Sequence, residues 1–259
     1  MLDLIKRLLL KIRKEGHIFF IKNLLVDIFV KKKPPHKYPY IILAIIEKMK
    51  AKSYLEIGVL KGDCFFTQKV KHKIAVDLEF KISRLKIIVY SLKNKFYEMP
   101  SDEFFIRKAK ILTKYGLDIA FIDGLHTYEQ SLKDVLNSLK YLNNNGYIIL
   151  HDCYPQNKLQ ANLTKSEKHF KNLNSPKSGW SGDVWKTIAH LRSTRTDLKI
   201  LVINYDSGIG IISKGKSTSM LNCIKEDLKK LTYDDLIIDP KGILNLKPLS
   251  YFFEFIKTI

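Results

Sequence analysis

Cysteine is scarce in this chain of 259 residues, and its scarcity excludes two classes of protein. The three cysteines are Cys64, Cys153 and Cys223, which are widely spaced and odd in number. Disulfide-stabilised domains carry even sets of cysteines, and structural zinc sites carry closely spaced cysteine pairs. The chain is therefore expected to have neither a disulfide framework nor a cysteine zinc site, and to work in a reducing compartment.

Arginine is also scarce, although the protein is strongly basic. Lysine and arginine number 45 against 26 acidic residues, a formal net charge of +19, yet only six of the basic residues are arginines. Arginine is the commoner choice for bidentate recognition of phosphates and bases. The excess charge is either a compositional bias, with lysines solvated over the surface, or a field for an acidic glycan, nucleic acid or anionic membrane. The first interpretation is favoured, and a nucleic-acid partner is not expected.

No apolar run is long enough to cross a bilayer. The most apolar stretch, residues 18–30, is interrupted by Lys22, Asn23 and Asp27. Basic residues also interrupt the first apolar positions, and no small-residue cleavage site follows, so a signal peptide is not expected. Residues 1–31 predict two basic amphipathic helices, either a cap on the main domain or a second subunit, or a peripheral membrane contact. The expected location is the cytoplasm, with association with the cytoplasmic side of a membrane and a homo-oligomer left open.

The chain divides by pattern into three segments. Residues 1–37 are expected to be a basic amphipathic helical extension, with its linker at residues 31–35. Residues 38–215 alternate strand and helix patterns and form the main domain, and residues 216–259 form a C-terminal extension. No internal repeat is visible.

Residues 117–153 predict a strand, a helix and a second strand. The apolar, β-branched run 119–122 predicts a strand buried on both faces, and it ends at Asp123. Thr127, followed three residues later by Gln130, predicts a capping box, after which apolar residues recur at helical spacing. A helix is therefore expected directly after the first acid.

The second strand of this unit also ends on an acid. Residues 143–146, Asn-Asn-Asn-Gly, predict a helix end that tolerates left-handed backbone. The strand at residues 147–150 then runs into His151 and Asp152. The carboxyl ends of parallel strands share one edge of a sheet, where α/β folds bind ligands. Asp123 and Asp152 are expected to meet there.

An earlier strand also ends with an acid. Residues 54–58 predict a strand that ends on Glu56 and Gly58, with Gly62 four residues further on, spaced E-x-G-x-x-x-G. A dinucleotide-binding loop has a third glycine, which allows the pyrophosphate to approach the backbone, and this loop lacks that glycine. An acid before the first glycine instead suits a cationic group such as an amino-acid ammonium.

The next two loops fit a nucleoside. Asp77 ends a strand 19 residues after Gly58, where it can accept both ribose hydroxyls. Ser101 and Asp102 follow a strand expected at residues 96–99, in position to meet an adenine. Together the loops describe an adenosine with a positively charged amino-acid tail, which is S-adenosylmethionine.

Five segments in order resemble the motifs of class I S-adenosylmethionine-dependent methyltransferases: YLEIGVLKGDCF, KIAVDLEF, MPSDEFF, FIDGLHTYEQSLKDV and NNGYIILHDCYP. More narrowly, they resemble the branch of catechol and sugar O-methyltransferases found in glycan and natural-product pathways. The resemblance covers about residues 38–213. It implies an α/β, Rossmann-like seven-stranded sheet in the order 3-2-1-4-5-7-6, with strand 7 antiparallel and helices on both faces. A hairpin expected at residues 199–213 fits that last strand.

The resemblance also implies S-adenosylmethionine as the cofactor and a set of residues around it. This set comprises Glu56, Gly58, Val59, Gly62, Asp77, Ser101, Asp102 and Asp123.

Catalysis is expected from Asp123 and His126. His126 lies three residues after Asp123, where catechol-type relatives place a lysine base. An imidazole can accept a hydroxyl proton near neutral pH. The alternative is a residue that only caps the following helix.

A divalent metal such as Mg²⁺ is left open. In the related enzymes the acids at Asp123 and Asp152 would bind it, together with an oxygen ligand directly after the second acid. That next residue is Cys153 here, and cysteine is a poor ligand for a hard cation. His126 or His151 could complete a softer site.

Expectations also follow for five other residues. Glu129 and Asp134 are expected to be exposed, although Glu129 lies near the site, and Asp183 is expected to cap a helix that begins at residue 184. Trp185 is expected in the core, while acceptor contact is left open for Trp180.

The expected function is methyl transfer to a hydroxyl, with a sugar or glycan precursor as the acceptor. One alternative is a nucleic-acid-binding or RNA-modifying protein that uses the positive charge, although the chain has no Asn-Pro-Pro-Tyr or Asp-Pro-Pro-Tyr amino-methylation motif. A second alternative is an NAD(P)-dependent oxidoreductase, and a third is a methyltransferase-like module without catalysis.

Overall fold

A computed structural model describes residues 38–162, 179–221 and 228–259. The helices expected at residues 1–31 and the linker at residues 31–35 lie outside this part of the chain. Contacts between residues divide the chain into residues 1–35 and residues 36–259, and the account below concerns the second unit.

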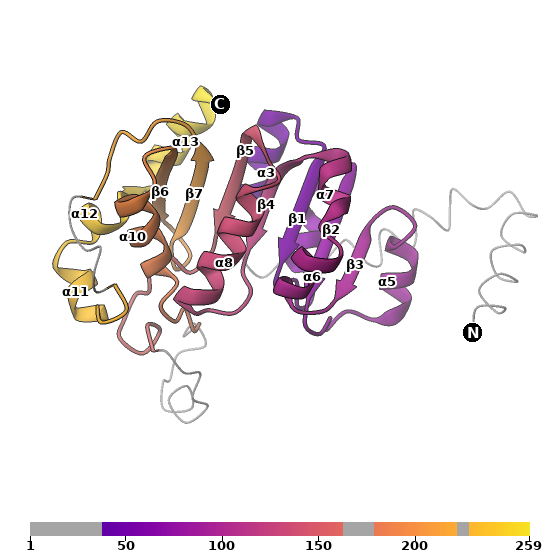
Figure 1. Cartoon of the computed structure of the whole chain (residues 1–259), viewed down its shortest axis with the longest axis horizontal. Coiled ribbons are helices and arrows are strands. Elements are labelled where there is room, and N and C mark those ends of the chain that lie inside the picture. The colour runs from indigo at the N-terminus through magenta and orange to yellow at the C-terminus, as the bar shows by residue number, and fades with distance from the viewer. Residues whose placement is uncertain (1–37, 163–178, 222–227) are drawn as a thin grey trace, which may run out of the picture. The chain divides into compact units, whose positions relative to one another are not determined.

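One mixed sheet of eight strands, in the order β3-β2-β1-β4-β5-β7-β6-β8, forms the centre of this unit (Figure 1). The strands are β1 (Ser53–Ile57), β2 (His72–Asp77), β3 (Lys95–Glu98), β4 (Leu117–Ile122), β5 (Leu142–Leu150), β6 (Leu198–Asn204), β7 (Ile209–Lys214) and β8 (Leu246–Pro248). Strand β7 runs antiparallel to both β5 and β6. The predicted strand order and the antiparallel seventh strand are confirmed, and β8 adds a strand that pairs parallel with β6.

Helices cover both faces of the sheet. One apolar cluster includes side chains from α6, α7, α8, α10, α11 and α12, and the other includes side chains from α3, α4 and α13. The helices are α3 (Tyr38–Met49), α4 (Asp63–Thr67), α5 (Arg84–Tyr90), α6 (Ser101–Arg107), α7 (Lys110–Tyr115), α8 (Tyr128–Leu139), α10 (Trp185–Thr194), α11 (Tyr233–Ile238), α12 (Pro240–Leu244) and α13 (Leu249–Thr258). None of these described helices is both long and apolar enough to span a membrane.

The central strands are apolar at nearly every position because both of their faces are covered. In β4, Ala120 and Ile122 pack into one cluster, while Ile119 and Phe121 pack into the other. Parallel pairing aligns Ile122 with Ile57 of β1 on one side and with Leu150 of β5 on the other. The residues that follow these strands therefore meet at one edge of the sheet.

The end of α8 differs from the prediction. Gly146 was expected to close the helix in a left-handed conformation, but its φ is not positive, and residues 142–146 already belong to β5. A Cβ at Gly146 would lie 2.9 Å from the carbonyl oxygens of Leu117 and Asp118. The glycine is thus required by close contact with β4, where the β4–β5 register shifts.

Candidate functional site

The backbones at the ends of β1 and β4 touch, and Gly58 makes this possible. The Asp123 amide donates to the carbonyl of Ile57 at 2.8 Å, and the Gly58 amide donates to Val76 at 2.9 Å. Gly58 has φ +86°, and a Cβ there would stand 2.0 Å from the Asp123 carbonyl oxygen. Any side chain at residue 58 would push Asp123 away.

Asp77 holds the glycine loop with its carboxylate. One oxygen accepts a hydrogen bond from the Leu60 amide at 2.7 Å, and the other accepts from Glu79 at 3.1 Å. Leu60 and Gly62 both have positive φ, so the loop between β1 and α4 turns sharply. The structure therefore joins Asp77 to the loop that contains Gly58, Val59 and Gly62.

Glu56 is the most deeply buried acid of the predicted set, with 1% of its surface exposed. Its carboxylate accepts a hydrogen bond from the hydroxyl of Tyr54. Burial raises the pKa of Glu56 to about 8, against the opposing effects of Tyr54 and the charge of Lys73. Glu56 therefore holds a proton at neutral pH unless a cation approaches it.

Ser101 and Asp102 begin α6 and are tied to α8 by Gln130. The Gln130 amide donates to Ser101 Oγ at 3.1 Å, and to carboxylate oxygens of Asp102 and Asp134 at 3.2 Å each. Asp134 was expected to be exposed, but only 1% of its surface is. The expectation was wrong because α6 covers this face of α8, and burial raises the pKa of Asp134 to about 6.

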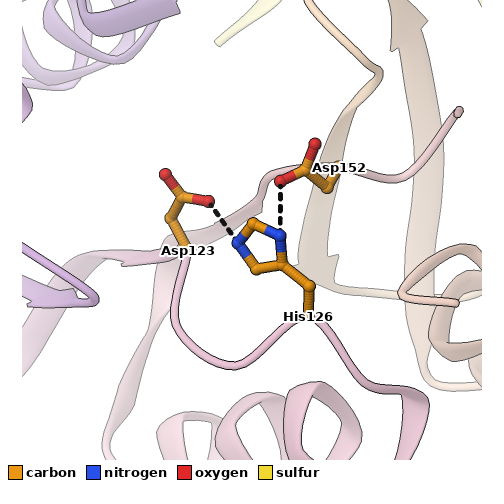
Figure 2. A group of neighbouring side chains, drawn as sticks. All are labelled: Asp123, His126 and Asp152. Carbon is orange, nitrogen blue, oxygen red and sulfur yellow. Dashed lines mark ion pairs between the residues drawn. The ribbon is translucent and has the colours of Figure 1, made fainter. Parts of the chain in front are cut away.

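Two histidines and two aspartates meet beyond the ends of β4 and β5, and Figure 2 shows three of these residues, Asp123, His126 and Asp152. His126 lies between the acids, with Nε2 3.4 Å from Asp123 Oδ1 and Nδ1 3.4 Å from Asp152 Oδ2. His151 Nδ1 is 3.2 Å from Asp123 and 3.3 Å from Asp152. The predicted residues Asp123, His126 and Asp152 are thus brought together, and His151 bridges the two acids from a second side.

The aspartates and histidines of this cluster stabilise each other's charged forms, which shifts their pKa values. Burial alone would lower the pKa of His126, but the hydrogen bond to Asp123 and the charge of Asp152 outweigh it and raise the pKa to about 9. Burial likewise opposes the proton on His151, whose pKa the two aspartates raise well above its usual range. Burial would raise the pKa of Asp123, yet His151 and His126 hold it below the usual range. The cluster is therefore two ion pairs.

The segment before α10 supports the cluster, a role that the sequence did not reveal. The Ser181 hydroxyl donates to Asp152 at 2.7 Å, and the carbonyl of Trp180 contacts His126 Nδ1. The Trp180 ring stacks on the His126 ring, with centroids 5.1 Å apart. A Cβ at Gly182 would lie 1.8 Å from the His126 carbonyl oxygen. The run Gly-Trp-Ser-Gly-Asp was the available signal, since glycines in a polar loop allow close backbone contact.

Asp183 caps a different helix from the one expected. Its carboxylate accepts from the Tyr128 amide of α8 at 2.7 Å and pairs with Lys186 at 3.2 Å. The N-cap of α10 is Val184, which makes no side-chain capping bond. The prediction was wrong because the nearest unpaired amide belongs to α8 rather than to the helix that follows in sequence.

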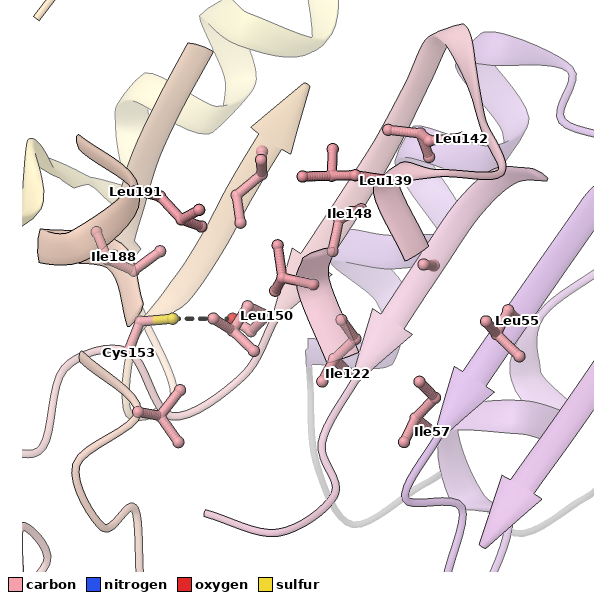
Figure 3. Close-up of a cluster of buried hydrophobic side chains, with 14 of the residues drawn as sticks. Leu55, Ile57, Ile122, Leu139, Leu142, Ile148, Leu150, Cys153, Ile188 and Leu191 are labelled. Atoms are coloured by element: carbon pink, nitrogen blue, oxygen red, sulfur yellow. Dashed lines mark hydrogen bonds between the residues drawn. The ribbon is translucent and has the colours of Figure 1, made fainter. Parts of the chain in front are cut away.

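Cys153 points away from the site and into the core (Figure 3). Its thiol lies 3.2 Å from the Leu150 carbonyl oxygen, and Ile188 and Leu191 belong to the same apolar cluster. Asp152, just before it, has φ +59°, and this turn sends the two side chains in different directions. Cys153 therefore cannot contribute a ligand to the cluster.

The cluster fits a divalent ion without Cys153. Ligand atoms of Asp123, His126 and Asp152 all lie within 4.8 Å of one another. Two carboxylates and an imidazole suit Mn²⁺, Fe²⁺ or Zn²⁺ as well as Mg²⁺. Within the described residues, His151 Nε2 is a buried nitrogen without a hydrogen-bond partner. The three residues that offer ligand atoms therefore do not include residue 153.

Two further residues lie outside the cluster. Glu129 is exposed, as expected, and pairs with Lys229 at 3.2 Å. Trp185 is buried in the core with 1% of its surface exposed, which confirms its expected place.

Comparison with known proteins agrees with this geometry. Residues 55–153 match the protein family described as a methyltransferase domain. No curated protein sequence matches the chain. Among solved structures, a Staphylococcus aureus protein assigned as a caffeoyl-CoA O-methyltransferase is 15% identical, with a TM-score of 0.53 over 81% of this chain and 98% of its own. The methyltransferase PaMTH1 of Podospora anserina, solved with S-adenosylhomocysteine, is 18% identical, with a TM-score of 0.53 over 73% of this chain and 83% of its own.

The match of residues 55–153 to a methyltransferase domain agrees with the class that the motifs resemble, and the solved structures confirm the fold. They support neither the nucleic-acid alternative nor the oxidoreductase alternative.

Proposed function

Because residues 55–153 match a methyltransferase domain, we propose that the chain uses S-adenosylmethionine to methylate a hydroxyl group of a sugar or glycan precursor. The donor would lie along the ends of β1 to β4. Glu56, Gly58, Val59 and Gly62 would face its methionine end, Asp77 its ribose, and Ser101 with Asp102 its adenine, as the sequence predicts. Asp123 would lie between donor and acceptor.

The observation that supports this proposal best is the position of His126 between two carboxylates. Methyl transfer to oxygen is an in-line displacement at the sulfonium, and the acceptor hydroxyl must lose its proton. His126 contacts Asp123 through Nε2 and Asp152 through Nδ1, so its ring is fixed from both sides. Once the charged ring has lost one proton, the neutral imidazole can accept the hydroxyl proton, which passes from the acceptor oxygen to the free ring nitrogen.

The donor itself would prepare the base. In the free protein the pKa of His126 is raised to about 9, so the ring is charged at neutral pH. A sulfonium cation placed beside Asp123 opposes a second positive charge there and favours the neutral imidazole. Proton loss from His126 is therefore coupled to donor binding.

A divalent ion would have its ligands in Asp123 and Asp152, with His126 near enough to be a third. When bound, it would supply a positive charge that makes the acceptor hydroxyl more acidic. Ser181 would keep the Asp152 carboxylate oriented in either case.

The sugar acceptor is supported by Trp180. Its ring is partly exposed and lies against His126, and its indole nitrogen donates to the Asn162 carbonyl at 2.6 Å. A ring fixed in this way offers an apolar surface beside the base, and a sugar ring presents both apolar and hydroxyl groups to such a site.

Calorimetry with three ligands tests the donor. S-adenosylmethionine and S-adenosylhomocysteine should bind to the full chain, and NADH should not. If neither sulfur compound binds, the proposed function is wrong. A screen of nucleotide sugars with radiolabelled donor then tests the acceptor class.

The variant His126→Ala tests the base. It should keep S-adenosylhomocysteine affinity and lose turnover by about 10²–10⁴-fold, the usual contribution of a general base. His72→Ala is the matched control, because His72 begins β2 at the end opposite Asp77 and should keep full turnover. Unchanged turnover in His126→Ala would remove His126 from catalysis.

A further inference from the structure

Helix α5 and the turn that follows it present an apolar stripe to solvent. Leu85, Ile88, Val89 and Leu92 follow the spacing i, i+3, i+4 and i+7, which in a soluble protein normally marks the face that packs on the core. Here the exposed fractions of these side chains are 55%, 41%, 39% and 81%, and Leu78 in the preceding loop is 70% exposed. These five residues are called the α5 patch below.

The opposite side of α5 already makes its own contacts. Ile82, just before the helix, is buried, and the Tyr90 ring contacts Phe66 with centroids 4.6 Å apart. Lys86 places its ammonium 3.6 Å from the centre of the same Phe66 ring. The helix is therefore anchored to the domain by that side, and no residue of α5 itself is fully buried. The α5 patch is therefore a second apolar face of a helix whose opposite side already packs on the domain.

Positive charge lies at both ends of the patch. Residues 78–96 contain five basic residues, Lys81, Arg84, Lys86, Lys93 and Lys95, and one acid, Glu79. Lys86 lies against Phe66 on the anchored side, and Lys81 is paired with Glu79. Arg84 begins the helix, Lys93 follows its end by three residues, and both are exposed. The surface is thus apolar in the middle and cationic at its borders.

We propose that the α5 patch binds the surface of an anionic lipid bilayer. Leucine, isoleucine and valine would enter the acyl boundary, while the flanking lysines and arginine would meet lipid phosphates, as in interfacial amphipathic helices. The β3 end of the sheet, where Figure 1 draws α5, would be the side of the domain that faces the membrane.

Charge argues against two other occupants of the patch. A second copy would bring an equally basic surface against it, and like charges across an interface are unfavourable. Residues 1–37 of the same chain are also rich in lysine and arginine relative to acids. An anionic bilayer is the occupant whose charge complements the border of the patch.

Flotation of the full chain with lipid vesicles tests the proposal. Vesicles of phosphatidylcholine with phosphatidylglycerol should bind the protein, and vesicles of phosphatidylcholine alone should bind it much less. The triple variant Leu85→Ser/Ile88→Ser/Leu92→Ser should lose about tenfold or more of the binding to anionic vesicles. Its control, Ile237→Ser/Ile238→Ser, alters two exposed residues of α11 and should bind as the parent does.

A charge pair completes the test. Arg84→Glu/Lys93→Glu should weaken binding about tenfold or more, and Lys216→Glu/Lys241→Glu, with the same change in net charge, should not. All variants should keep S-adenosylhomocysteine affinity, which shows that they fold. Equal vesicle binding by the parent and both α5 variants would overturn the proposal. So would a dimer in sedimentation equilibrium that the triple serine variant dissociates, because a second copy would then occupy the patch.

Discussion

The backbone of Gly182 lies directly against the backbone of His126. A Cβ at residue 182 would stand 1.8 Å from the His126 carbonyl oxygen, and Gly182 has φ +58°. The loop before α10 and the loop after β4 can approach this closely only because residue 182 has no side chain.

Gly182→Ala should therefore damage both stability and turnover. The left-handed backbone alone costs about 1–2 kcal/mol for a residue with a Cβ, and the contact with His126 adds to it. Denaturant unfolding should show the loss, and turnover should fall because His126 is displaced. Gly179→Ala is the control, since a Cβ there meets no atom within 4 Å. An alanine at residue 182 that leaves both quantities unchanged would contradict this account.

Donor binding should release a proton from Glu56. Burial raises the pKa of Glu56 to about 8, so the group is mostly protonated at pH 7, and the ammonium of the donor favours the carboxylate. Calorimetry in two buffers of different ionisation enthalpy should show a release of up to roughly one proton from Glu56, because its pKa falls on binding, in addition to the proton that His126 loses. Glu56→Gln should lower the release by up to roughly one proton, whereas Asp77→Asn should weaken donor binding but leave the proton release unchanged. The same release in Glu56→Gln would rule out Glu56 as its source.

Asp134 should make stability fall as the pH rises. Its folded-state pKa is raised by burial from 3.8 to about 6, so the folded protein binds the proton more tightly than the unfolded chain does. The contribution of Asp134 to the free energy of unfolding is then largest below pH 4 and declines between pH 4 and 6, by about 3 kcal/mol. In Asp134→Asn the decline from pH 4 to 7 should be smaller than in the parent by this amount, and the remainder should come from Glu56, whose pKa is also raised.

Glu129→Gln is the matched control for Asp134, because Glu129 lies on the same helix and is exposed. Its pH profile should follow the parent within about 0.5 kcal/mol. If Asp134→Asn shows the full decline of the parent, the buried carboxylate is not its cause.

Metal binding should depend on Asp123 and Asp152 and not on Cys153. Asp123→Asn and Asp152→Asn should each weaken Mn²⁺ binding at least about tenfold in calorimetry, and Mn²⁺ should bind more tightly than Mg²⁺. Trp180 fluorescence offers a second measurement, because its ring stacks on His126. Cys153→Ser should bind as the parent does, since this thiol lies in the core.

His126→Ala separates the two roles that the geometry allows for this residue. If the ion binds with little loss, His126 remains free to accept the acceptor proton, which is the expected result. Loss of the ion comparable to that in Asp152→Asn would make His126 a ligand and would contradict its role as the base.

The sequence predicted the fold well because strand patterns are local. Apolar runs that end in an acid located β1, β2, β4 and β5, and the resemblance supplied their order, which the sheet confirms. The methyltransferase class agrees with the match of residues 55–153 to a methyltransferase domain. The meeting of Asp123 with Asp152 followed from parallel pairing alone. The assignment of donor-binding and catalytic residues stays a prediction.

What the sequence could not supply depends on contacts between distant segments. Asp134 is buried because α6 covers it, and Asp183 caps α8 across more than fifty residues. Residue 146 must be glycine because its backbone lies in close contact with the backbone of β4. No local window contains both partners of these contacts, so propensity and spacing misplace all three residues.

Strand β8 has a consequence for how the domain reaches its native state. It is three residues long and pairs with β6 across more than forty residues of sequence. Until residues 246–248 arrive, the backbone of β6 is an open edge that can template pairing with another chain. During synthesis β6 and β7 emerge first, so this edge is exposed to neighbouring nascent chains for that interval. Strand β8, which is synthesised after β6 and β7, thus reduces the risk of aggregation by pairing with the exposed edge of β6, in addition to extending the sheet.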